Sequence, residues 1–508
     1  MYSKGMTTND LFLRAWHRHP DKRCLIDGIY SYSYREVNQE SNRFANAMRG
    51  LGVQKGEKVA LLAKDRKEFV FAYVGLSKIG AVMVPLNYRC VARELEYMLN
   101  DCEAKVLVFE AEYAQTVEQM RDNLPRVSHF ISLGECDSAF VTPYDNLACS
   151  SSNDEPNLEV LEDDECAIIY SSGTTGKPKG AVITHRTRVA CTVNILLDGS
   201  VEEEAVSLQA SPLFHAGALN IGLLPHLALG GTIVVIPRLH PEEIAKTIET
   251  KQVTHIVTIP TLINSMLEIG AFESFDFSSL RKIYYGGAAI CRRDLEMVLS
   301  KLPKVEFFQG YGTTEATQLT VLKPGYQISK IGCTGKPHVF VDLRVVDEDD
   351  QDVLPGQTGE IVTRGPHVMK EYLNLPGETE EAFRNGWFHT GDVARIDEDG
   401  FMTIVDRKKD VIISGAENIY PKEIEDVLHS HPKIKEAAVF GIPDEKWGES
   451  VCAAVILKEK ESLSEEEIIG YCKENLASYK KPRTVRFYES FPKNPLGKVQ
   501  KEELKKTV

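Results

Sequence analysis

A loop rich in glycine and hydroxyl side chains is the first stretch whose residues suit chemistry on an anion. It reads "YSSGTTGKPKG", Tyr170 to Gly180, and follows the apolar run "CAII". Glycines let backbone amides approach a ligand, hydroxyls donate hydrogen bonds, and lysines supply positive charge. A nucleotide P-loop requires G-x-x-x-x-G-K-[ST], whereas Gly173 and Gly176 enclose only two residues and Lys177 precedes proline. The stretch therefore predicts an anion-binding loop of another kind, with a plain surface turn as the alternative.

A second stretch, "FFQGYGTTEAT" from Phe307 to Thr317, combines hydroxyls with a carboxylate. It fails the dinucleotide-binding fingerprint because Glu315 stands where the third glycine belongs. Thr313 and Thr314 beside Glu315 suit a phosphate bridged to Mg²⁺, a hard cation that prefers oxygen ligands.

Motifs for covalent or metal-dependent hydrolysis are missing from the sequence. It contains no G-x-S-x-G, no H-E-x-x-H and no cluster of metal-ligand cysteines. This favours electrostatic over covalent catalysis. The eleven cysteines include no C-x-x-C pair, and no charged-then-apolar leader is seen, so we expect a reducing, cytoplasmic location.

The elements that position these loops follow an alternating pattern. Expected strands are "KVALLA", "AVMVPL", "AKVLVFE", "TIVVIP", "THIVTIP" and "VEFFQGYG", and an expected helix covers "EFVFAYVGLSKIG". Strands that alternate with helices predict parallel sheets covered by helices on both faces. The overall expectation is an α/β fold.

The sequence pattern changes after about residue 330. Short segments of alternating polar and apolar residues and the hairpin "VARIDEDGFMTIVDR" predict antiparallel structure there. From Lys409 onward, "YPKEIEDVLHSHP", "KEAAVFGIPD" and "SVCAAVILKE" predict a compact domain of about a hundred residues. A chain of 508 residues exceeds the size of a single core. We therefore expect a domain at 1–408 and a smaller one at 409–508, with "ACSSSNDEPN" at 148–157 as the most loop-like linker.

Composition excludes two classes of protein. With 43% hydrophobic and 26% charged residues the chain reads as soluble and globular, and a net charge of -15 argues against a nucleic-acid binder. Residues 216–237 carry no charge and are long enough to span a bilayer, but a histidine, a proline and the pair Gly230-Gly231 interrupt them. We expect a helix, a glycine break and a core strand there, and no integral membrane segment.

Seven motifs in order resemble the adenylate-forming superfamily of acyl-CoA synthetases, nonribosomal peptide adenylation domains and beetle luciferases. They are "YSSGTTGKPKGAVITH", "PLFHAGA", "YYGGAAI", "QGYGTTEAT", "WFHTGD", "VDRKKDVIISGAENIYPKEIE" and "NPLGKVQK". The resemblance implies a large N-terminal domain with α/β layers, parallel sheets and a distorted antiparallel β-barrel. It also implies a small mobile α+β C-terminal domain.

The resemblance further implies a reaction in two steps. A carboxylate attacks the α-phosphorus of ATP to give an acyl-adenylate and pyrophosphate, and the thiolate of CoA then displaces AMP. ATP, Mg²⁺ and coenzyme A are the implied cofactors. The attacking carboxylate is already ionised at neutral pH, so no general base is needed.

By the same resemblance, the first loop binds the β- and γ-phosphates through Ser171, Ser172, Gly173, Thr174, Thr175, Gly176, Lys177 and Lys179. Thr314 contacts the α-phosphate, Glu315 ligates Mg²⁺ and Tyr311 stacks on adenine. Gly286, Gly287, Ala288 and Ala289 flank the adenine and the acyl pocket. The remaining nucleotide-site positions are Gln309, Gly310, Gly312 and Thr313.

Two further charged groups match the family. Asp392 in "HTGD" corresponds to the carboxylate that accepts both ribose hydroxyls, with Arg407 as its companion; on its own, Asp392 reads as a turn aspartate. Lys498 in "NPLGKVQK" corresponds to the lysine that stabilises negative charge during adenylation. Its alternative is one solvated lysine among the nine basic residues of the last thirty.

The resemblance also assigns the second step. Lys409 matches the hinge about which the small domain rotates, after which Gly415 and Ala416 line the pantetheine tunnel. Ala416 departs from the second glycine of many members and narrows the tunnel slightly. Trp447 lies where the nucleotide part of CoA is approached, and His215 matches an aromatic gate, with a buried core histidine as the alternative.

The expected acyl pocket consists of residues 216–224, 258–265, 286–288 and 313–316, which include no basic residue. We therefore expect an apolar monocarboxylic acid: medium-chain, fatty, branched, alicyclic or aromatic. Acetate and dicarboxylates are disfavoured. Transfer to a carrier-protein thiol and a catalytically silent AMP sensor are the alternatives, although Glu315 and Lys498 are both present. The oligomeric state is open, with a homodimer as one option.

Overall fold

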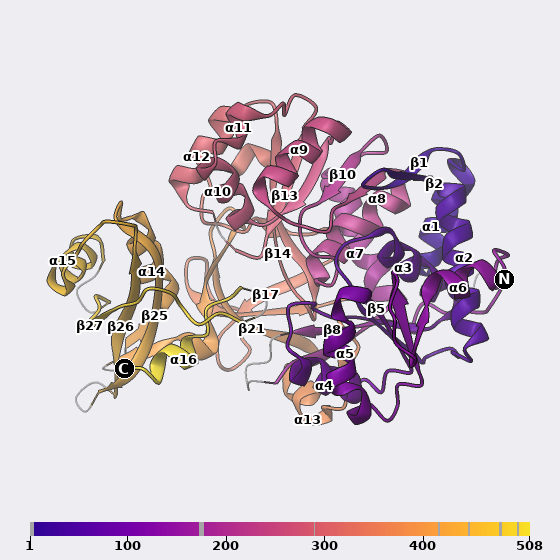
Figure 1. The fold of residues 1–508 in the computed structure, drawn as a ribbon. Helices are drawn as coiled ribbons and strands as arrows, with labels where there is room; N and C mark the ends of the chain where they lie inside the picture. Colours follow the sequence, from indigo (N-terminus) through magenta and orange to yellow (C-terminus); the bar gives the residue numbers. More distant parts are fainter. Residues whose placement is uncertain are drawn as a thin grey trace. The chain divides into compact units, whose positions relative to one another are not determined.

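The computed structural model in Figure 1 describes residues 5–171, 177–288, 290–414, 417–444, 448–476, 480–494 and 497–508. The chain forms two compact units. The first comprises Met1–Ala289, Glu296–Leu343 and Thr363–Phe388, and the second comprises Ile290–Leu295, Arg344–Val362 and His389–Val508.

A nine-stranded sheet forms one half of the first unit. Its strand order is β16 (Lys336–Pro337), β15 (Thr317–Leu322), β14 (Glu306–Thr313), β13 (Lys282–Gly286), β12 (His255–Thr258), β10 (Val206–Gln209), β11 (Thr232–Val235), β1 (Arg23–Asp27) and β2 (Tyr30–Ser33). The strands from β14 to β1 in this order are parallel. Parallel strands end at one edge, so the loops after β13 and β14 lie next to each other there.

An eight-stranded sheet forms the other half. Its order is β19 (Glu371–Tyr372), β9 (Lys179–Thr184), β8 (Glu165–Ser171), β4 (Val82–Pro85), β3 (Lys58–Leu62), β5 (Val106–Glu110), β6 (His129–Leu133) and β7 (Val141–Pro143). Strands β8 and β9 are antiparallel neighbours that pair Ser171 with Lys179. The glycine-rich loop is therefore the connection of a β-hairpin.

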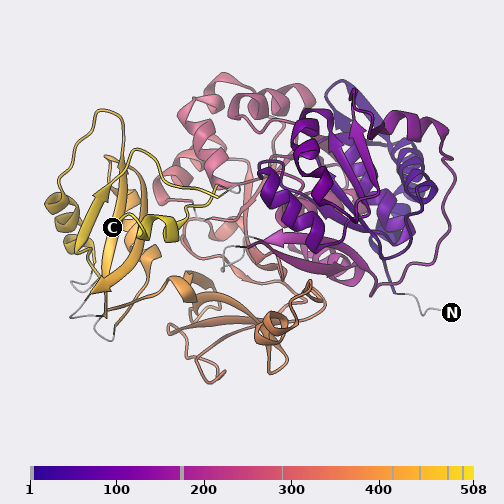
Figure 2. The same ribbon diagram turned by 60° about the horizontal axis from the view of Figure 1, so that its bottom comes forward.

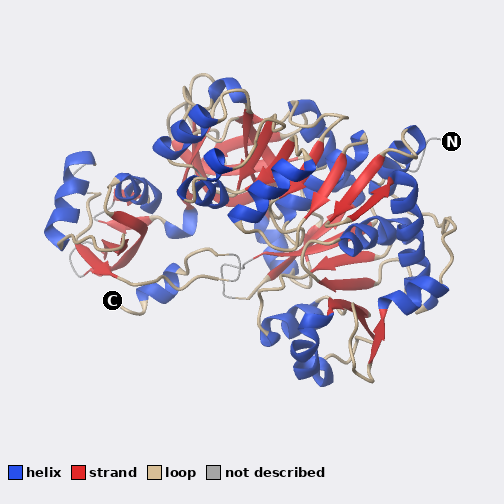
Figure 3. Ribbon diagram, turned by 45° about the horizontal axis from the view of Figure 1, so that its top comes forward, coloured by secondary structure: helices blue, strands red, loops and turns tan. Residues whose placement is uncertain are grey.

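Helices lie on the faces of both large sheets, as Figure 3 shows. Those up to residue 330 are α1 (Thr8–Arg18), α2 (Tyr34–Gly50), α3 (Lys67–Ile79), α4 (Ala92–Asp101), η1 (Ala111–Tyr113), α5 (Ala114–Met120), η2 (Arg121–Asn123), α6 (Tyr144–Ser150), α7 (His185–Asp198), η3 (Ala218–Leu223), α8 (Leu224–Leu229), α9 (Pro241–Lys251), α10 (Pro260–Glu268), α11 (Ala271–Ser274), α12 (Arg292–Lys301) and η4 (Pro324–Tyr326). Helix α3 is buried almost throughout, which matches its apolar sequence. The α/β class expected from the sequence is confirmed.

A curled antiparallel sheet, orange in Figure 2, follows residue 340. It contains β17 (Asp342–Val346), β18 (Thr358–Arg364), β21 (Trp387–Ile396) and β20 (Phe383–Arg384) in that order, with β22 (Met402–Arg407) beside β21. Helix α13 (Pro376–Ala382) precedes β20, and η5 (Lys408–Asp410) follows β22. The predicted hairpin is present, because β21 pairs with β22 from Asp392 and Arg407 down to the turn.

The C-terminal part has its own sheet and core. The strand order is β24 (Glu417–Ile419), β23 (Ile412–Ser414), β26 (Gly448–Leu457) and β25 (Ile434–Asp444), with β27 (Thr484–Phe487) beside β26. Its helices are α14 (Pro421–Ser430), α15 (Glu465–Asn475) and α16 (Lys501–Lys505). Apolar side chains of α14, α15 and the strands pack into one cluster on this sheet.

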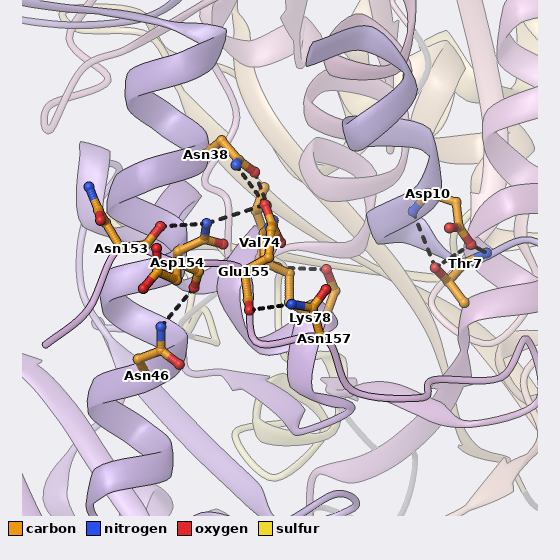
Figure 4. Close-up of polar contacts among 12 residues, drawn as sticks. Thr7, Asp10, Asn38, Asn46, Val74, Lys78, Asn153, Asp154, Glu155 and Asn157 are labelled. Atoms are coloured by element: carbon orange, nitrogen blue, oxygen red, sulfur yellow. Dashed lines mark hydrogen bonds and ion pairs between the residues drawn. The ribbon is translucent and has the colours of Figure 1, made fainter. Parts of the chain in front are cut away.

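The linker at 148–157 is fixed to the body by a buried cluster, shown in Figure 4. Lys78 on α3 is 3% exposed, and its Nζ donates to both Glu155 oxygens at 2.9 and 3.0 Å and to Asn38 Oδ1 at 2.7 Å. Asn46 on α2 donates to the carbonyl of Asp154 at 3.0 Å. A buried ammonium needs such acceptors, so the linker contributes its carboxylate to the core.

The uncharged stretch at 216–237 folds as expected. Helices η3 and α8 end at Gly230, which has a φ of +101° and stops the helix, and β11 then runs through the core. Within the part of the chain that the structure describes, each helix is too short or too polar to cross a bilayer.

Candidate active site

Glu315 belongs to a turn of the nine-stranded sheet, and its carboxylate accepts hydrogen bonds from two residues of the eight-stranded sheet. It sits in the turn between β14 and β15, and Thr313 Oγ1 accepts the backbone N–H of Ala316 at 3.0 Å within this turn. Glu315 Oε1 accepts hydrogen bonds from Ser171 Oγ at 3.2 Å and from Tyr372 OH at 3.1 Å. The structure therefore brings together Glu315 and Ser171, two residues predicted separately from the sequence.

Tyr372 is a site residue that the sequence analysis missed. It belongs to the two-residue strand β19, which pairs with β9 and so carries the tyrosine to the hairpin of the glycine-rich loop. Burial, followed by the negative charge of Glu315, raises the pKa of Tyr372, so the phenol keeps its proton and donates to the carboxylate.

The two lysines of the loop have partners in the same unit. Lys179 forms an ion pair with Glu378 of α13, and its Nζ lies 5.3 Å from the centre of the Tyr372 ring. Lys177 is exposed, and its Nζ lies 5.5 Å from the centre of the Tyr97 ring. Ser172, Gly173, Thr174, Thr175 and Gly176 fall outside the described residues.

The ends of β13 and β14 form a narrow backbone platform. A Cβ atom on Gly286 would lie 2.7 Å from the carbonyl oxygen of Gly310, and one on Gly312 would lie 1.7 Å from that of Thr317. Only glycine permits these approaches. Beneath the platform, Tyr285 OH donates to Gln309 Oε1 at 3.2 Å, which fixes Gln309 in the buried interior.

The remaining positions of this edge are partly accessible. Tyr311 and Thr314 are half-buried, Gly287 and Ala288 are exposed, and Ala289 falls outside the described residues. Gly287 has a φ of +81°, which allows the chain to turn away after β13. An open, side-chain-poor edge of this kind leaves room for a flat ligand, which is what the family resemblance implies.

His215 lies at the entrance to η3 and is half-buried. Its backbone N–H donates to the carbonyl of Pro212 at 2.9 Å, and its Nδ1 accepts the N–H of Gly217 at 3.1 Å. Helix η3 itself has i to i+5 hydrogen bonds, a rare form often found at functional sites. The buried Arg188 of α7 donates to Asn220 of η3 at 2.6 Å and so holds this segment in place.

Asp392 and Arg407 form a pair within the second unit. They are register partners on β21 and β22, and Arg407 Nε lies 3.3 Å from Asp392 Oδ1. Asp392 is buried whereas Arg407 is exposed. The carboxylate is thus held by the hairpin while its partner faces solvent, a geometry in which Asp392 can accept hydroxyl donors.

Glu360 supports this hairpin and was not predicted from the sequence. Its carboxylate accepts from Lys408 Nζ at 3.0 Å and from the N–H of Gly391 at 3.2 Å, and it pairs with His389 at 3.2 Å. Burial opposes ionisation of Glu360, but the hydrogen bonds from Lys408 and His389 outweigh it and lower its pKa. The backbone next to Asp392 is therefore anchored by a charged network.

Lys498 and Lys409 are both exposed in the second unit. Lys498 sits in a tight turn in which its N–H donates to Asn494 Oδ1 at 2.9 Å and its carbonyl accepts the N–H of Asn494 at 2.8 Å. Gly497, with a φ of +81°, completes this turn. Lys409 lies in η5, the short segment between β22 and β23. Gly415, Ala416 and Trp447 fall outside the described residues.

Comparison with known proteins identifies the class. A family model described as "AMP-binding enzyme" matches residues 12–373, and its companion "AMP-binding enzyme C-terminal domain" matches residues 423–498. The chain therefore belongs to the AMP-binding enzyme family, within the adenylate-forming superfamily that its motifs resemble.

Individual relatives cover nearly the whole chain. It is 36% identical to a feruloyl-CoA synthase of Amycolatopsis sp over 97% of both proteins. It is 35% identical to the long-chain-fatty-acid–CoA ligase FadD13 of Mycobacterium tuberculosis (strain CDC 1551 / Oshkosh) over 93% of this chain and 92% of the relative. The crystal structure of the anthranilate CoA ligase AuaEII with anthranoyl-AMP matches with a TM-score of 0.90 and 28% identity over 99% and 97% of the two chains. The expectation of an AMP-forming acid–CoA ligase is confirmed.

Proposed function

We propose that the protein is an ATP-dependent acyl-CoA synthetase that activates an apolar monocarboxylic acid through an acyl-adenylate. The observation that carries this proposal is the meeting of Ser171, Glu315 and Lys179 around Tyr372 at the end of the β8–β9 hairpin. A complex of Mg²⁺ with a triphosphate needs a carboxylate as a metal ligand and hydroxyl and ammonium groups as donors to the phosphate oxygens. All three kinds of group lie together at this edge of the sheet.

The residues present fit Mg²⁺. Glu315 offers a hard carboxylate oxygen at a half-buried position, oriented by two hydroxyl donors. Among the described residues, no group of three or more acidic, histidine or cysteine side chains is arranged as a metal cage. A single carboxylate with water and phosphate ligands is the usual Mg²⁺ arrangement, so Glu315 would hold the ion. When bound, Mg²⁺ offsets charge on the phosphate oxygens.

Different residues of the chain then bind the different parts of ATP during adenylation. Ser171, Lys177 and Lys179 bind the β- and γ-phosphates, Thr314 contacts the α-phosphate, and the platform at Gly286 and Gly310 receives the adenine. Asp392 accepts the ribose hydroxyls, and Arg407 is its ion-pair partner. The acid's carboxylate attacks the α-phosphorus, pyrophosphate leaves, and Lys498 stabilises the negative charge that builds up between the carboxylate and the α-phosphate.

For the second half-reaction, the domain at 409–508 rotates about Lys409. The exposure of Lys409 in a three-residue turn supports this role, because few contacts resist a backbone change there. The thiolate of CoA then attacks the acyl carbon and AMP leaves, with His215 gating the route and Trp447 near the nucleotide of CoA.

The residues that line the expected acyl pocket are the reason for proposing an apolar substrate. Helix η3 is buried along its whole length and presents Ile221 to a cluster that includes Val257 and Phe308. The names of the two relatives, feruloyl and long-chain fatty acyl, leave the exact acid open.

The test is ATP–pyrophosphate exchange over a panel of acids, repeated with CoA and monitored for the thioester. We expect octanoate, benzoate and cinnamate derivatives to be activated far better than acetate or malonate. A best response to acetate or malonate would contradict the substrate class. Exchange without any thioester in the presence of CoA would contradict the second half-reaction and point to another acceptor.

A further inference from the structure

Asp65 is a buried carboxyl group that has no part in the steps described so far. It follows β3 in the stretch "LLAKDRKEF", belongs to the first unit and is 3% exposed. Its Oδ1 accepts the backbone N–H of Leu213 at 2.8 Å, and its Oδ2 is buried without a hydrogen-bond partner among the described residues. Burying a carboxyl group is unfavourable, and the contact with Leu213 is what this one gains.

Leu213 belongs to the turn that carries His215. The N–H of His215 donates to the carbonyl of Pro212 at 2.9 Å, so this turn encloses Leu213 and Phe214. Both enclosed side chains are buried, whereas His215 is half-buried. Asp65 therefore holds the backbone in the middle of the turn, two residues before the histidine.

A second contact on the same turn comes from Tyr88, which follows β4. Its ring meets that of Phe214 edge-on, with ring centres 5.4 Å apart and an interplanar angle of 86°. Strands β3 and β4 are parallel neighbours, so Asp65 and Tyr88 both follow the carboxyl edge of the eight-stranded sheet. The turn itself follows β10 of the nine-stranded sheet. Two residues from one sheet thus fix a turn that belongs to the other.

The edge that supplies these contacts also supplies Ser171 to the candidate site. Strand β8 is parallel to its neighbour β4, and Ser171 is the last residue of β8. Ligands of open α/β sheets bind beyond the carboxyl ends of the strands. The turn of His215 is therefore anchored from the edge at which the reaction is proposed to take place.

Asp65 can hold Leu213 without being charged. Burial raises the pKa of Asp65 to about 8; the N–H of Leu213 and the charge of Arg89 oppose this rise, and the carboxylate of Glu110 adds to it. The carboxyl group is therefore mostly protonated at pH 7, and a neutral oxygen accepts the N–H of Leu213. An amide oxygen in the same place would accept it equally well.

We propose that Asp65 is a positioning residue for the second half-reaction, because its hydrogen bond to Leu213 fixes the turn that holds His215 at the route of CoA. This inference rests on the proposed function, in which His215 gates that route. Adenylation does not use the gate, so the loss of the hydrogen bond should slow thioester formation and spare adenylate formation.

The test measures the two half-reactions separately in the full chain. Asp65→Leu removes the acceptor at similar volume. With supplied acyl-adenylate of the panel acid that exchanges fastest, we expect kcat/KM for CoA to fall at least about tenfold, while pyrophosphate exchange changes less than about twofold. Asp65→Asn keeps an acceptor and should stay within about threefold of wild type in both assays.

The outcomes that contradict the inference differ from those that contradict the proposed function. If Asp65→Leu slows both steps equally or neither, or if Asp65→Asn loses as much of the CoA step as Asp65→Leu, the inference is overturned. If the wild-type enzyme forms no thioester from any acid, the proposed function fails, and the inference falls with it.

Asp198→Leu is the matched control. Asp198 is another buried carboxyl group with one backbone donor, the N–H of Ser200 at 2.7 Å. It lies near Lys282, the first residue of β13, at the edge of the nine-stranded sheet opposite the platform. This variant should change the unfolding temperature and leave the ratio of the two rates unchanged.

A double-mutant cycle tests whether Asp65 acts through His215. In the His215→Ala background, Asp65→Leu should lower kcat/KM for CoA by less than about twofold, because the residue that it positions is gone. An undiminished loss in that background overturns the inference. If Asp65→Leu does not fold, Tyr88→Leu, which removes the ring contact on Phe214, should slow the CoA step at least about threefold and spare exchange. An unchanged CoA step in this variant then overturns the inference.

Discussion

The hydrogen bond from Tyr372 to Glu315 offers a sharp test of the proposed metal site. Tyr372→Phe removes the hydroxyl 3.1 Å from Glu315 Oε1 and keeps the ring over which Lys179 lies at 5.3 Å. The substitution therefore changes the orientation of one carboxylate without removing the neighbouring aromatic contact.

The expected magnitude follows from the two donors to that oxygen. A hydrogen bond to a charged group contributes about 1.5–3 kcal/mol. The pKa of Tyr372 is raised, first by burial, so the donor is present at every working pH. Tyr372 orients the carboxylate and is not itself a ligand of the ion, which places the loss at the lower end of the range. About 1.5 kcal/mol corresponds to a roughly tenfold weaker apparent affinity for Mg²⁺.

The assay is pyrophosphate exchange at saturating acid and ATP, titrated with Mg²⁺. We expect the half-saturating Mg²⁺ concentration to rise roughly tenfold, with most of the rate restored at high Mg²⁺. Tyr34→Phe is the control, because it removes another buried phenol, which donates to the Gly231 carbonyl at 2.7 Å on the far side of the unit. A lowered rate with an unchanged Mg²⁺ requirement would refute the assignment of Glu315 as the metal ligand.

Three other outcomes are expected. Lys498→Ala should lower adenylate formation at least about 100-fold while sparing thioester formation from supplied acyl-adenylate, and Lys506→Ala should change neither step; equal loss of both steps contradicts the role. Asp392→Asn should raise the KM for ATP roughly tenfold through two weakened ribose hydrogen bonds, whereas Glu398→Gln in the same hairpin should not; an unchanged KM argues against ribose binding. Glu155→Ala should lower the unfolding temperature more than Lys78→Met, because it leaves a buried ammonium without its carboxylate, at a cost of about 3 kcal/mol; the reverse order contradicts this account.

The last of these outcomes has a pH dependence of known sign. Burial opposes ionisation of Glu155, but Lys78 outweighs it and lowers the pKa of Glu155 below its ordinary value of 4.5. A lowered folded-state pKa means that the ionised carboxylate stabilises the fold at neutral pH. This contribution is lost as the pH falls below about 4.5 and through the folded-state pKa. Wild-type stability should therefore fall more steeply than that of Glu155→Ala in thermal unfolding between pH 6 and pH 3.

Local patterns were sufficient to predict the fold class and part of the site. The apolar runs that define β3, β4, β5 and β12 are continuous because parallel strands are buried on both faces. The order of the motifs then identified the family, and with it Glu315 and the glycine-rich loop. Each of these patterns lies within a short stretch of the chain, so it can be recognised from a single sequence.

Tyr372 and Glu360 could not be found in this way. Tyr372 reaches Glu315 only because a two-residue strand pairs with β9, and such a short pairing leaves no periodic signal. Glu360 and its partners Lys408 and His389 also come from separate segments, and their contact has no counterpart in spacing or composition.

The partners of the loop residues bear on how an acidic protein would bind the polyanion that the proposed function requires. Lys179 is paired with Glu378, and Ser171 donates to Glu315. The charge of Lys179 is therefore balanced by Glu378 in this structure, so this lysine adds no excess positive charge that would destabilise the fold. The proposed function requires an exchange of partners, in which Lys179 would leave Glu378 and Ser171 would leave Glu315 for phosphate oxygens. Such an exchange would weaken ground-state binding of the polyanion, and the return of Lys179 to Glu378 would favour release of pyrophosphate.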